Sequence, residues 1–407
     1  MSVPAEYSPE AVAAASTEAF APYREFLASG EPYRSLLRHN PWLRVPAAHE
    51  ALEWGNGWYY DTTVARKHPY WRDKRLPRPT RDLQAMRHDL YDWGFCLIEA
   101  GVSESQCRRL RERVAEQAAA ERALGIAHLS PAQQHVWALV NKGEVFVRCM
   151  EHDPDAVQAG PVIERLLDEL LGPGWNHFSF ISNISFPDCH PQGMHQDQGF
   201  LAPFPFTEGP ALVNTIYILQ DVDEVNGGTL LIPGSHRCNG SGGERYGELP
   251  PPINLEAPGG SILIMDGRTL HGGAVNRSDR LRYVITNSTV KPWVRQQENF
   301  ALTISPEVLA QASPRFLMRA GLQATAVSSM VEGYGYTGNG RAGDPNGALV
   351  HVRNEMDQGS YRHVGALSPA DVENLDVRQF ALARIQQAHE THRNERFRSL
   401  LERCRDR

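Results

Sequence analysis

One short segment carries two side chains that could bind a metal ion together. His195 and Asp197 stand two residues apart in GMHQDQGF. If this segment is a strand, both side chains leave the same face and can converge on one point. An imidazole and a carboxylate are two of the three ligands of a facial triad, which leaves other metal positions open for small molecules. The pair alone is a weak signal, because a solvated turn can contain it by chance.

A third ligand has to come from elsewhere in the chain, and the candidates are His190, His236 and His271. His271 follows SILIMDGRTL, which has the pattern of a buried strand ending in a turn. It precedes GGAVNRSDRLRYVIT, which places arginines shortly after it. This position favours His271, while the other two histidines stay open as alternatives.

The arginines that follow His271 point to a particular cosubstrate. An enzyme that uses 2-oxoglutarate needs a fixed cation for the far carboxylate, and arginine binds carboxylates through two parallel hydrogen bonds. Arg277 and Arg280 belong to the polar NRSDR turn, where charged side chains are ordinary. Arg282 instead lies inside the expected strand LRYVITNS, on the face opposite its two neighbours. We therefore favour Arg282.

Short apolar or alternating runs between about residues 176 and 290 would position these candidates. They are HFSFISNISF, ALVNTIYIL, GGTLLIP, SILIMD and LRYVITNSTV. β-branched and aromatic residues favour strands, and regular punctuation by Gly, Pro and Asn is typical of a sandwich or barrel. We expect a mainly β core with flanking helices, of the double-stranded β-helix (jelly roll, cupin-like) type.

Helices are expected before and after this β core. LYDWGFCLIEAGV indicates a helix end and a short strand, and Ser103 with Gln106 forms a capping-box signature before an amphipathic helix. Two more helices are expected, over residues 131–148 and, with a proline at its start, over residues 161–171. Helical patterns return near residues 306–322 and 372–390.

The chain is predicted to form one catalytic domain in three parts. Residues 1–80 are an aromatic-rich extension packed on the core, residues 81–300 are the double-stranded β-helix core with its supporting helices, and residues 301–407 are a helical and loop extension. The first part holds four of the eight tryptophans, too many for a disordered tail, because disordered segments are poor in aromatic residues. An arm on the core is the simpler interpretation, and a lid that touches substrate is the alternative.

Composition is that of an ordinary globular enzyme, with 407 residues, 41% hydrophobic and 22% charged residues, and a net charge of −7. The sequence contains no cluster of Lys and Arg of the kind that binds nucleic acid or a membrane surface, so we expect a small-molecule substrate. A secretory signal and a long apolar run are both absent from the sequence, and the six cysteines are scattered as free thiols. We predict a cytoplasmic protein, and the sequence indicates no oligomeric state.

Four motifs in order, over about residues 89–290, resemble the phytanoyl-CoA dioxygenase-like (PhyH) family of Fe(II)/2-oxoglutarate-dependent oxygenases. They are DWGFCLIEAGVS, MHQDQGFLAPFPF, DEVNGGTLLIPGSHR and DGRTLHGGAVNRSDRLR. The resemblance implies a double-stranded β-helix in which His195, Asp197 and His271 bind iron. It also implies that Arg282 forms the salt bridge to 2-oxoglutarate.

The resemblance further suggests that Gln196 helps to place the cosubstrate, although a strand would turn this side chain away from the metal. His236 is then expected to support the mouth of the barrel. Candidates for contact with substrate are less specific, since each such residue more often serves simple packing or hydrogen-bond filling. They are Asn183, Asn214, Phe200, Phe204 and Phe206.

The implied reaction uses Fe(II), 2-oxoglutarate and O2 to oxidise a small organic or natural-product-like substrate, with release of succinate and CO2. Halogenases of the wider class replace the proximal carboxylate by a small residue, so Asp197 favours hydroxylation, or a related desaturation or cyclisation. Two other classes stay open. One is a non-catalytic jelly-roll metal-binding module, and the other is a Zn or Mn hydrolase or isomerase on a cupin-like fold, which leaves Arg282 without a purpose.

Overall fold

The computed structural model describes most of the chain between residues 69 and 322 and a few short pieces outside it. The described residues are 43–44, 59–60, 69–124, 126–129, 133–187, 189, 192–201, 206–237, 250, 252–322, 336–337, 341–342, 365–368 and 370–371.

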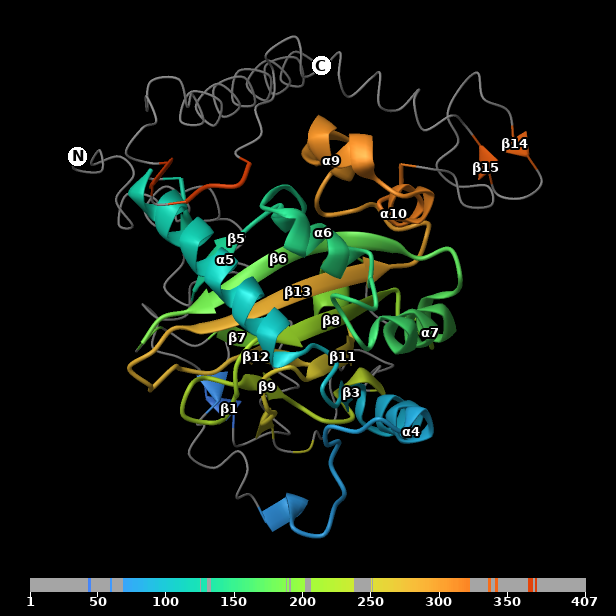
Figure 1. Ribbon diagram of the computed structural model, residues 1–407. Coiled ribbons are helices and arrows are strands. Elements are labelled where there is room, and N and C mark those ends of the chain that lie inside the picture. The colour runs from blue at the N-terminus through green and yellow to red at the C-terminus, as the bar shows by residue number, and fades with distance from the viewer. Residues whose placement is uncertain are drawn as a thin grey trace, which may run out of the picture.

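Two antiparallel sheets form the centre of the molecule (Figure 1). The larger sheet has the order β3-β11-β8-β13-β6-β5-β4, and the smaller has the order β10-β9-β12-β7. The strands of the larger sheet are β3 (Phe95–Ile98), β4 (His128–Leu129), β5 (Gln134–Val136), β6 (Asn176–Ser185), β8 (Leu212–Ile218), β11 (Ile262–Asp266) and β13 (Arg282–Val290). Those of the smaller sheet are β7 (Gln192–His195), β9 (Thr229–Leu231), β10 (Ile253–Asn254) and β12 (His271–Gly273).

The chain passes back and forth between the two sheets. From β6 to β13, strands β6, β8, β11 and β13 join the larger sheet, while β7, β9, β10 and β12 join the smaller. This alternation is the topology of a double-stranded β-helix, so the predicted jelly-roll core is confirmed.

Each face of the larger sheet packs against a different layer. On the inner face, Ile216 and Val284 join one buried apolar cluster with Leu231 of the smaller sheet. On the outer face, Tyr217 and Ile262 join a second cluster with residues of the covering helices. Alternate residues of one strand therefore serve the two layers, as the two-residue period of a strand requires.

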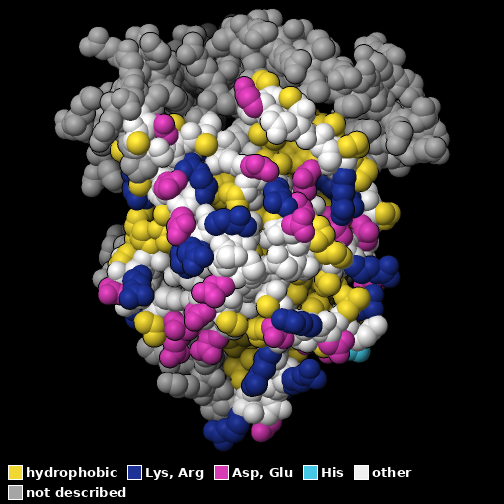
Figure 2. Space-filling model, in the orientation of Figure 1, with side chains coloured by type: hydrophobic (Ala, Val, Ile, Leu, Met, Phe, Trp, Pro, Cys, Tyr) yellow, Lys and Arg dark blue, Asp and Glu magenta, His cyan; other side chains and the backbone are white. Residues whose placement is uncertain are grey.

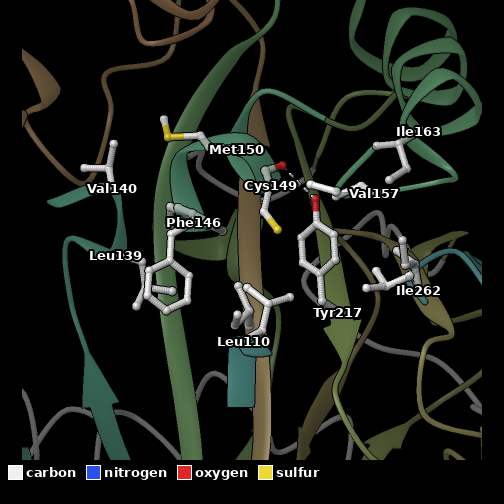
Figure 3. Close-up of a cluster of buried hydrophobic side chains, with 14 of the residues drawn as sticks. Leu110, Leu139, Val140, Phe146, Cys149, Met150, Val157, Ile163, Tyr217 and Ile262 are labelled. Atoms are coloured by element: carbon white, nitrogen blue, oxygen red, sulfur yellow. Dashed lines mark hydrogen bonds between the residues drawn. The ribbon is translucent and has the colours of Figure 1, made fainter. Parts of the chain in front are cut away.

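Four helices cover the outer face, which Figure 1 views directly. They are α4 (Leu83–Trp93), α5 (Glu104–Ala123), α6 (Glu144–Met150) and α7 (Gly160–Leu171). Figure 3 shows Leu110, Phe146 and Ile163 of three of these helices in one apolar layer over the sheet. The Tyr217 hydroxyl, buried in this layer, donates to the carbonyl of Cys149 at 3.2 Å and so avoids an unpaired polar group.

The first predicted helices are confirmed, with one detail changed. α4, β3 and α5 lie where the sequence places them, and Ser103 accepts from the Gln106 backbone N–H. The second half of the capping box is different, because the Ser103 N–H donates to Gln158 at 2.7 Å rather than to Gln106. The helix predicted over residues 161–171 is confirmed as α7.

The helix predicted over residues 131–148 is wrong in its first half. That segment forms β5, the short 3-10 helix η4 (Leu139–Asn141) and only then α6. β5 pairs with β6 from Gln134 to Val136, so sheet hydrogen bonds replace a local helix. Gly143, with a φ of 138°, then separates η4 from α6.

Some described parts of the extensions contact the core. β1 (Leu43–Arg44) pairs with β2 (Tyr59–Tyr60), and β2 lies against β7. After the core come α8 (Phe300–Thr303), α9 (Pro306–Gln311) and α10 (Pro314–Arg319), of which α9 and α10 confirm the helix predicted near 306–322, in two separate pieces. The Leu367 N–H donates to Gln117 of α5 at 2.7 Å. The short strand β14 (Tyr336–Thr337) pairs with β15 (Arg341–Ala342), and the helix predicted over 372–390 lies outside the described residues.

Lys and Arg are interspersed with Asp and Glu over the face that Figure 2 shows, which agrees with the absence of a basic cluster in the sequence. The four cysteines that the structure describes, Cys96, Cys107, Cys149 and Cys189, are buried and free. Among the described residues, no helix is both long enough and apolar enough to span a membrane.

Candidate active site

The smaller sheet brings two distant histidines side by side. His195 is the last residue of β7 and His271 is the first residue of β12, and they are direct partners in the antiparallel register. Asp197 begins the short 3-10 helix η5 (Asp197–Phe200). Between them, Gln196 keeps an extended backbone (φ −124°, ψ 119°). The alternation expected of a strand therefore carries through to Asp197, although β7 itself ends two residues earlier.

The three side chains converge closely enough to share one ion. Nε2 of His195 lies 3.3 Å from Oδ1 of Asp197, and Nε2 of His271 lies 3.4 Å from Oδ2 of the same carboxylate. One ligand atom from each residue lies within 4.8 Å of the other two, and no other such group of three occurs in the part of the chain that is described. Adjacent ligands of an ion with bonds of about 2.1 Å are about 3 Å apart. The geometry therefore fits a small transition-metal ion.

Hydrogen bonds hold the candidate ligands in this orientation. Nδ1 of His271 lies 3.0 Å from the carbonyl of Thr269, so this nitrogen carries the proton and Nε2 keeps its lone pair for a metal. The Asn214 amide donates to Oδ2 of Asp197 at 2.6 Å, and the Ser288 hydroxyl donates to Asn214 at 2.6 Å. Asn214, a sequence candidate for substrate contact, thus supports Asp197 from β8. The cluster of His195, Asp197 and His271 is called the metal group below.

The protonation states suit metal binding. Burial alone would raise the pKa of Asp197, but His271, His195 and the Asn214 amide outweigh it and hold this pKa well below its usual range. Burial lowers the pKa of His271 to about 4. At neutral pH the carboxylate is therefore ionised and the imidazole neutral, which are the forms that coordinate a metal.

Arg282 is a buried cation without an acidic partner among the described residues. It is the first residue of β13, pairs with Ser185 of β6, and donates from Nη2 to the Ser185 hydroxyl at 2.6 Å. Its Nε is buried without a hydrogen bond in the described part of the chain. Burial lowers its pKa to about 10, so the guanidinium stays charged at neutral pH. A buried, charged fork with a free donor fits the carboxylate of a ligand.

Gln196 points away from the metal group, as strand alternation predicts. Its side-chain amide donates to the carbonyl of Arg268 at 2.5 Å, in the turn between β11 and β12. Arg268 forms a buried ion pair with Asp266 at 2.6 Å and donates to the carbonyl of Thr207 at 2.9 Å. This buried anchor was not identified from the sequence, although DGR lies within a recognised motif.

His236 lies outside the metal group and contacts α4 instead. Its Nε2 is 3.0 Å from the carbonyl of Tyr91. Gly94, which ends α4 with a φ of 80°, packs so closely that a Cβ there would stand 2.5 Å from both Nδ1 of His236 and the hydroxyl of Thr269. This placement agrees with a supporting role at the end of the barrel.

The remaining sequence candidates fall in different places. Asn183 is half-buried on β6, and Phe206 is buried in the loop before β8. His190, Phe204 and the side chain of Phe200 lie outside the described residues.

A double-stranded β-helix that carries two histidines and one carboxylate is an architecture of non-haem iron oxygenases. Residues 90–284 match the family model "Phytanoyl-CoA dioxygenase (PhyH)". This segment is therefore a PhyH family domain, and the protein is an Fe(II)/2-oxoglutarate-dependent dioxygenase.

Curated relatives bear the same type of name. "Dioxygenase af480" of Aspergillus fumigatus is 27% identical over 248 residues, which cover 58% of this chain and 76% of the relative. "Dioxygenase aneA" of Aspergillus aculeatus is 28% identical, over 38% of this chain and 54% of the relative. Among solved structures, the "non-heme alpha ketoglutarate dependent carbocyclase SnoK" has a TM-score of 0.43 and 16% identity, and covers 58% of this chain and 95% of that one.

Proposed function

We propose that this protein hydroxylates a small organic substrate, with Fe(II) bound by His195, Asp197 and His271 and with 2-oxoglutarate held by Arg282. In the balanced reaction, substrate, 2-oxoglutarate and O2 give hydroxylated product, succinate and CO2. The observation that carries this proposal is Arg282, a buried cation that has no acidic partner among the described residues and lies on the sheet that faces the metal group.

Each side chain has a separate task in this proposal. Bound iron would supply the site at which 2-oxoglutarate and O2 react. Asp197 is ionised and held by Asn214, so little reorganisation is needed when the metal binds. The proton on Nδ1 of His271 fixes the ring, and Arg282 fixes the far end of the cosubstrate. The substrate needs only correct positioning, since hydrogen abstraction requires no general base.

Gln196 would act on the cosubstrate indirectly. Its amide holds the Arg268 carbonyl, and Arg268 in turn is fixed by Asp266. This chain of contacts ties the residue between the two proximal ligands to the turn that leads into His271. We therefore assign Gln196 to positioning the metal group.

Isotope-labelled O2 tests this proposal against its alternatives. The purified protein is incubated with Fe(II), 2-oxoglutarate and labelled O2, with and without compounds of several classes. Succinate with one labelled oxygen, and a product that gains one labelled oxygen, are expected. Bound metal without succinate would instead indicate a binding module, and metal-dependent turnover without O2 would indicate a hydrolase or isomerase. A product that loses two hydrogens and gains no oxygen would replace hydroxylation by desaturation.

A further inference from the structure

A group of aromatic and amide side chains extends the inner face of the larger sheet beyond β6. His128 of β4 is the direct partner of His135 of β5, and His135 is the direct partner of Asn183 of β6. Asn183 in turn is paired with Val284, which packs in the inner cluster between the two sheets. Directly paired residues point to the same face, so this row of side chains faces inward, on the side of the metal group.

This row ends beside the proposed cosubstrate site. Along β13, Val284 is the next residue after Arg282 that points inward, a step of about 7 Å. A molecule lying on His135 and Asn183 would therefore stand next to the end of 2-oxoglutarate that Arg282 binds.

Hydrogen bonds fix which ring atoms are available. The Trp137 indole N–H donates to Nδ1 of His128 at 2.8 Å. The amide of Gln133 lies 3.3 Å from Nε2 of His135, and an amide nitrogen can only donate. Nε2 of His135 is therefore the acceptor, and the ring proton sits on Nδ1.

Two neighbouring polar atoms are poorly paired in this arrangement. Nδ1 of His135 and Oδ1 of Asn183 are both buried and interact only with each other, outside the geometry of a good hydrogen bond. One is a donor and the other an acceptor. Because a buried polar pair without good hydrogen-bond geometry is costly, a ligand hydroxyl that enters between the two atoms would complete both, as acceptor from His135 and donor to Asn183.

The surrounding rings are neutral, with His128 and His135 packed edge to face and Trp137 tilted against both. The ring centroids of His128 and His135 are 5.2 Å apart, and those of Trp137 are 5.7 and 5.8 Å from them. Burial lowers the pKa of His135 to about 4 and also lowers that of His128. All three residues keep partial exposure, although Nδ1 of His135 itself is buried.

We propose that His128, His135, Trp137 and Asn183 form the substrate-positioning surface, and that it takes a neutral ring-bearing molecule whose hydroxyl group bonds to His135 and Asn183. This inference rests on the proposed function and names its substrate class. Neutral aromatic rings stack on a flat apolar partner. They supply no cation for the phosphates of an acyl-CoA, which would be recognised by Lys or Arg.

Anaerobic calorimetry with matched compounds tests this proposal. The full chain, loaded with Fe(II) and 2-oxoglutarate, is titrated with naphthol against naphthalene, with hydroxyfluorene against fluorene, and with palmitoyl-CoA. The hydroxylated member of each pair should bind about tenfold more tightly, the value of one good hydrogen bond. In His135→Phe, which keeps a ring and removes both nitrogens, that ratio should fall to about one. The control is His88→Ala, at an exposed histidine on α4, which should keep the wild-type ratio.

Turnover gives a second readout with whichever hydroxylated probe stimulates succinate release. His135→Phe should raise the KM for that probe about tenfold, with a change below about twofold in the KM for 2-oxoglutarate. Equal binding of hydroxylated and plain compounds, absence of binding by all neutral probes, or preferred binding of palmitoyl-CoA would each overturn the inference. If labelled succinate forms but the hydroxylated and plain compounds of each pair bind equally, this inference fails while the proposed function stands. If the hydroxylated compounds bind about tenfold more tightly but no succinate forms, the proposed function fails instead.

Discussion

The side chain of Asn214 donates a hydrogen bond of 2.6 Å to Oδ2 of Asp197, and thereby connects a strand of the larger sheet to the metal group at the end of the smaller one. Ser288, the direct partner of Asn214 on β13, donates to the same amide. Asp197 itself stands on a short 3-10 segment, which has little rigidity of its own. The larger sheet therefore sets the orientation of this carboxylate.

This contact predicts a loss of metal affinity when the amide is removed. Asn214→Ala should weaken Fe(II) binding about 10- to 100-fold, because the carboxylate loses the donor that orients it. Thr215→Val is the matched control, since Thr215 is buried next to Asn214 on the opposite face of β8. Metal titration followed by calorimetry measures both variants. Equal affinity in Asn214→Ala and the control would show that the contact does not orient Asp197.

Replacement of Arg282 should act on the cosubstrate. Arg282→Leu should raise the KM for 2-oxoglutarate about 100-fold or more, because a buried charged hydrogen-bond partner is lost. Arg282→Lys should recover part of this loss, since it keeps the charge without the fork. Arg280→Ala, in the exposed turn, serves as the control and should keep the wild-type value. An unchanged KM in Arg282→Leu would remove Arg282 from the site.

Variants of His271 and His236 distinguish a metal ligand from a residue that only stabilises the fold. His271→Ala should abolish stoichiometric iron binding, because one of three ligands is missing. His236→Ala should keep the iron but lower the Tm by a few degrees, since a buried contact with the Tyr91 carbonyl is lost. Metal analysis and scanning calorimetry on both variants check this. Iron lost in His236→Ala and retained in His271→Ala would reverse the assignment.

Glu298 predicts a dependence of stability on pH. Burial raises its pKa to about 7, although the backbone N–H groups of Ala138 and Phe180 donate to it. The usual pKa is about 4.5. Between about pH 4.5 and 7 the folded state binds a proton that the unfolded state does not, so this contribution to stability is full at low pH and is lost as the pH rises through 7.

The test compares the wild type with Glu298→Gln, which cannot titrate. The Tm of the wild type relative to the variant should fall by a few degrees between about pH 5 and about pH 8. Scanning calorimetry at both pH values measures this difference. A Tm difference that is the same at both pH values would mean that Glu298 is ionised throughout.

Much of the fold and of the candidate site could be predicted from the sequence, because the signals were local. Strand alternation placed His195 and Asp197 on one side, and the apolar run before His271 placed it at a strand end. Arg282 was chosen as the candidate for binding 2-oxoglutarate by its position inside a strand pattern, and the structure places it there, on β13. In each case the sequence pattern that determines the position of the side chain lies within a few residues of it.

Other features depend on contacts between distant segments and left no local signal. The role of Asn214 depends on Ser288, 74 residues away. Arg268 is fixed by carbonyls of a loop about 60 residues earlier in the chain. The segment 131–148 was misassigned for the same reason, because pairing of β5 with β6 overrides its helical pattern.

The most direct test of the central claim combines iron content with succinate release in wild type and Asp197→Ala. Asp197 is ionised, faces both histidines, and is replaceable without disturbing a sheet strand. We predict one iron per wild-type chain, with succinate formed from 2-oxoglutarate and O2, and loss of both in a variant whose Tm remains within a few degrees of the wild type. Succinate release by Asp197→Ala at the wild-type rate would contradict the assignment of the metal group.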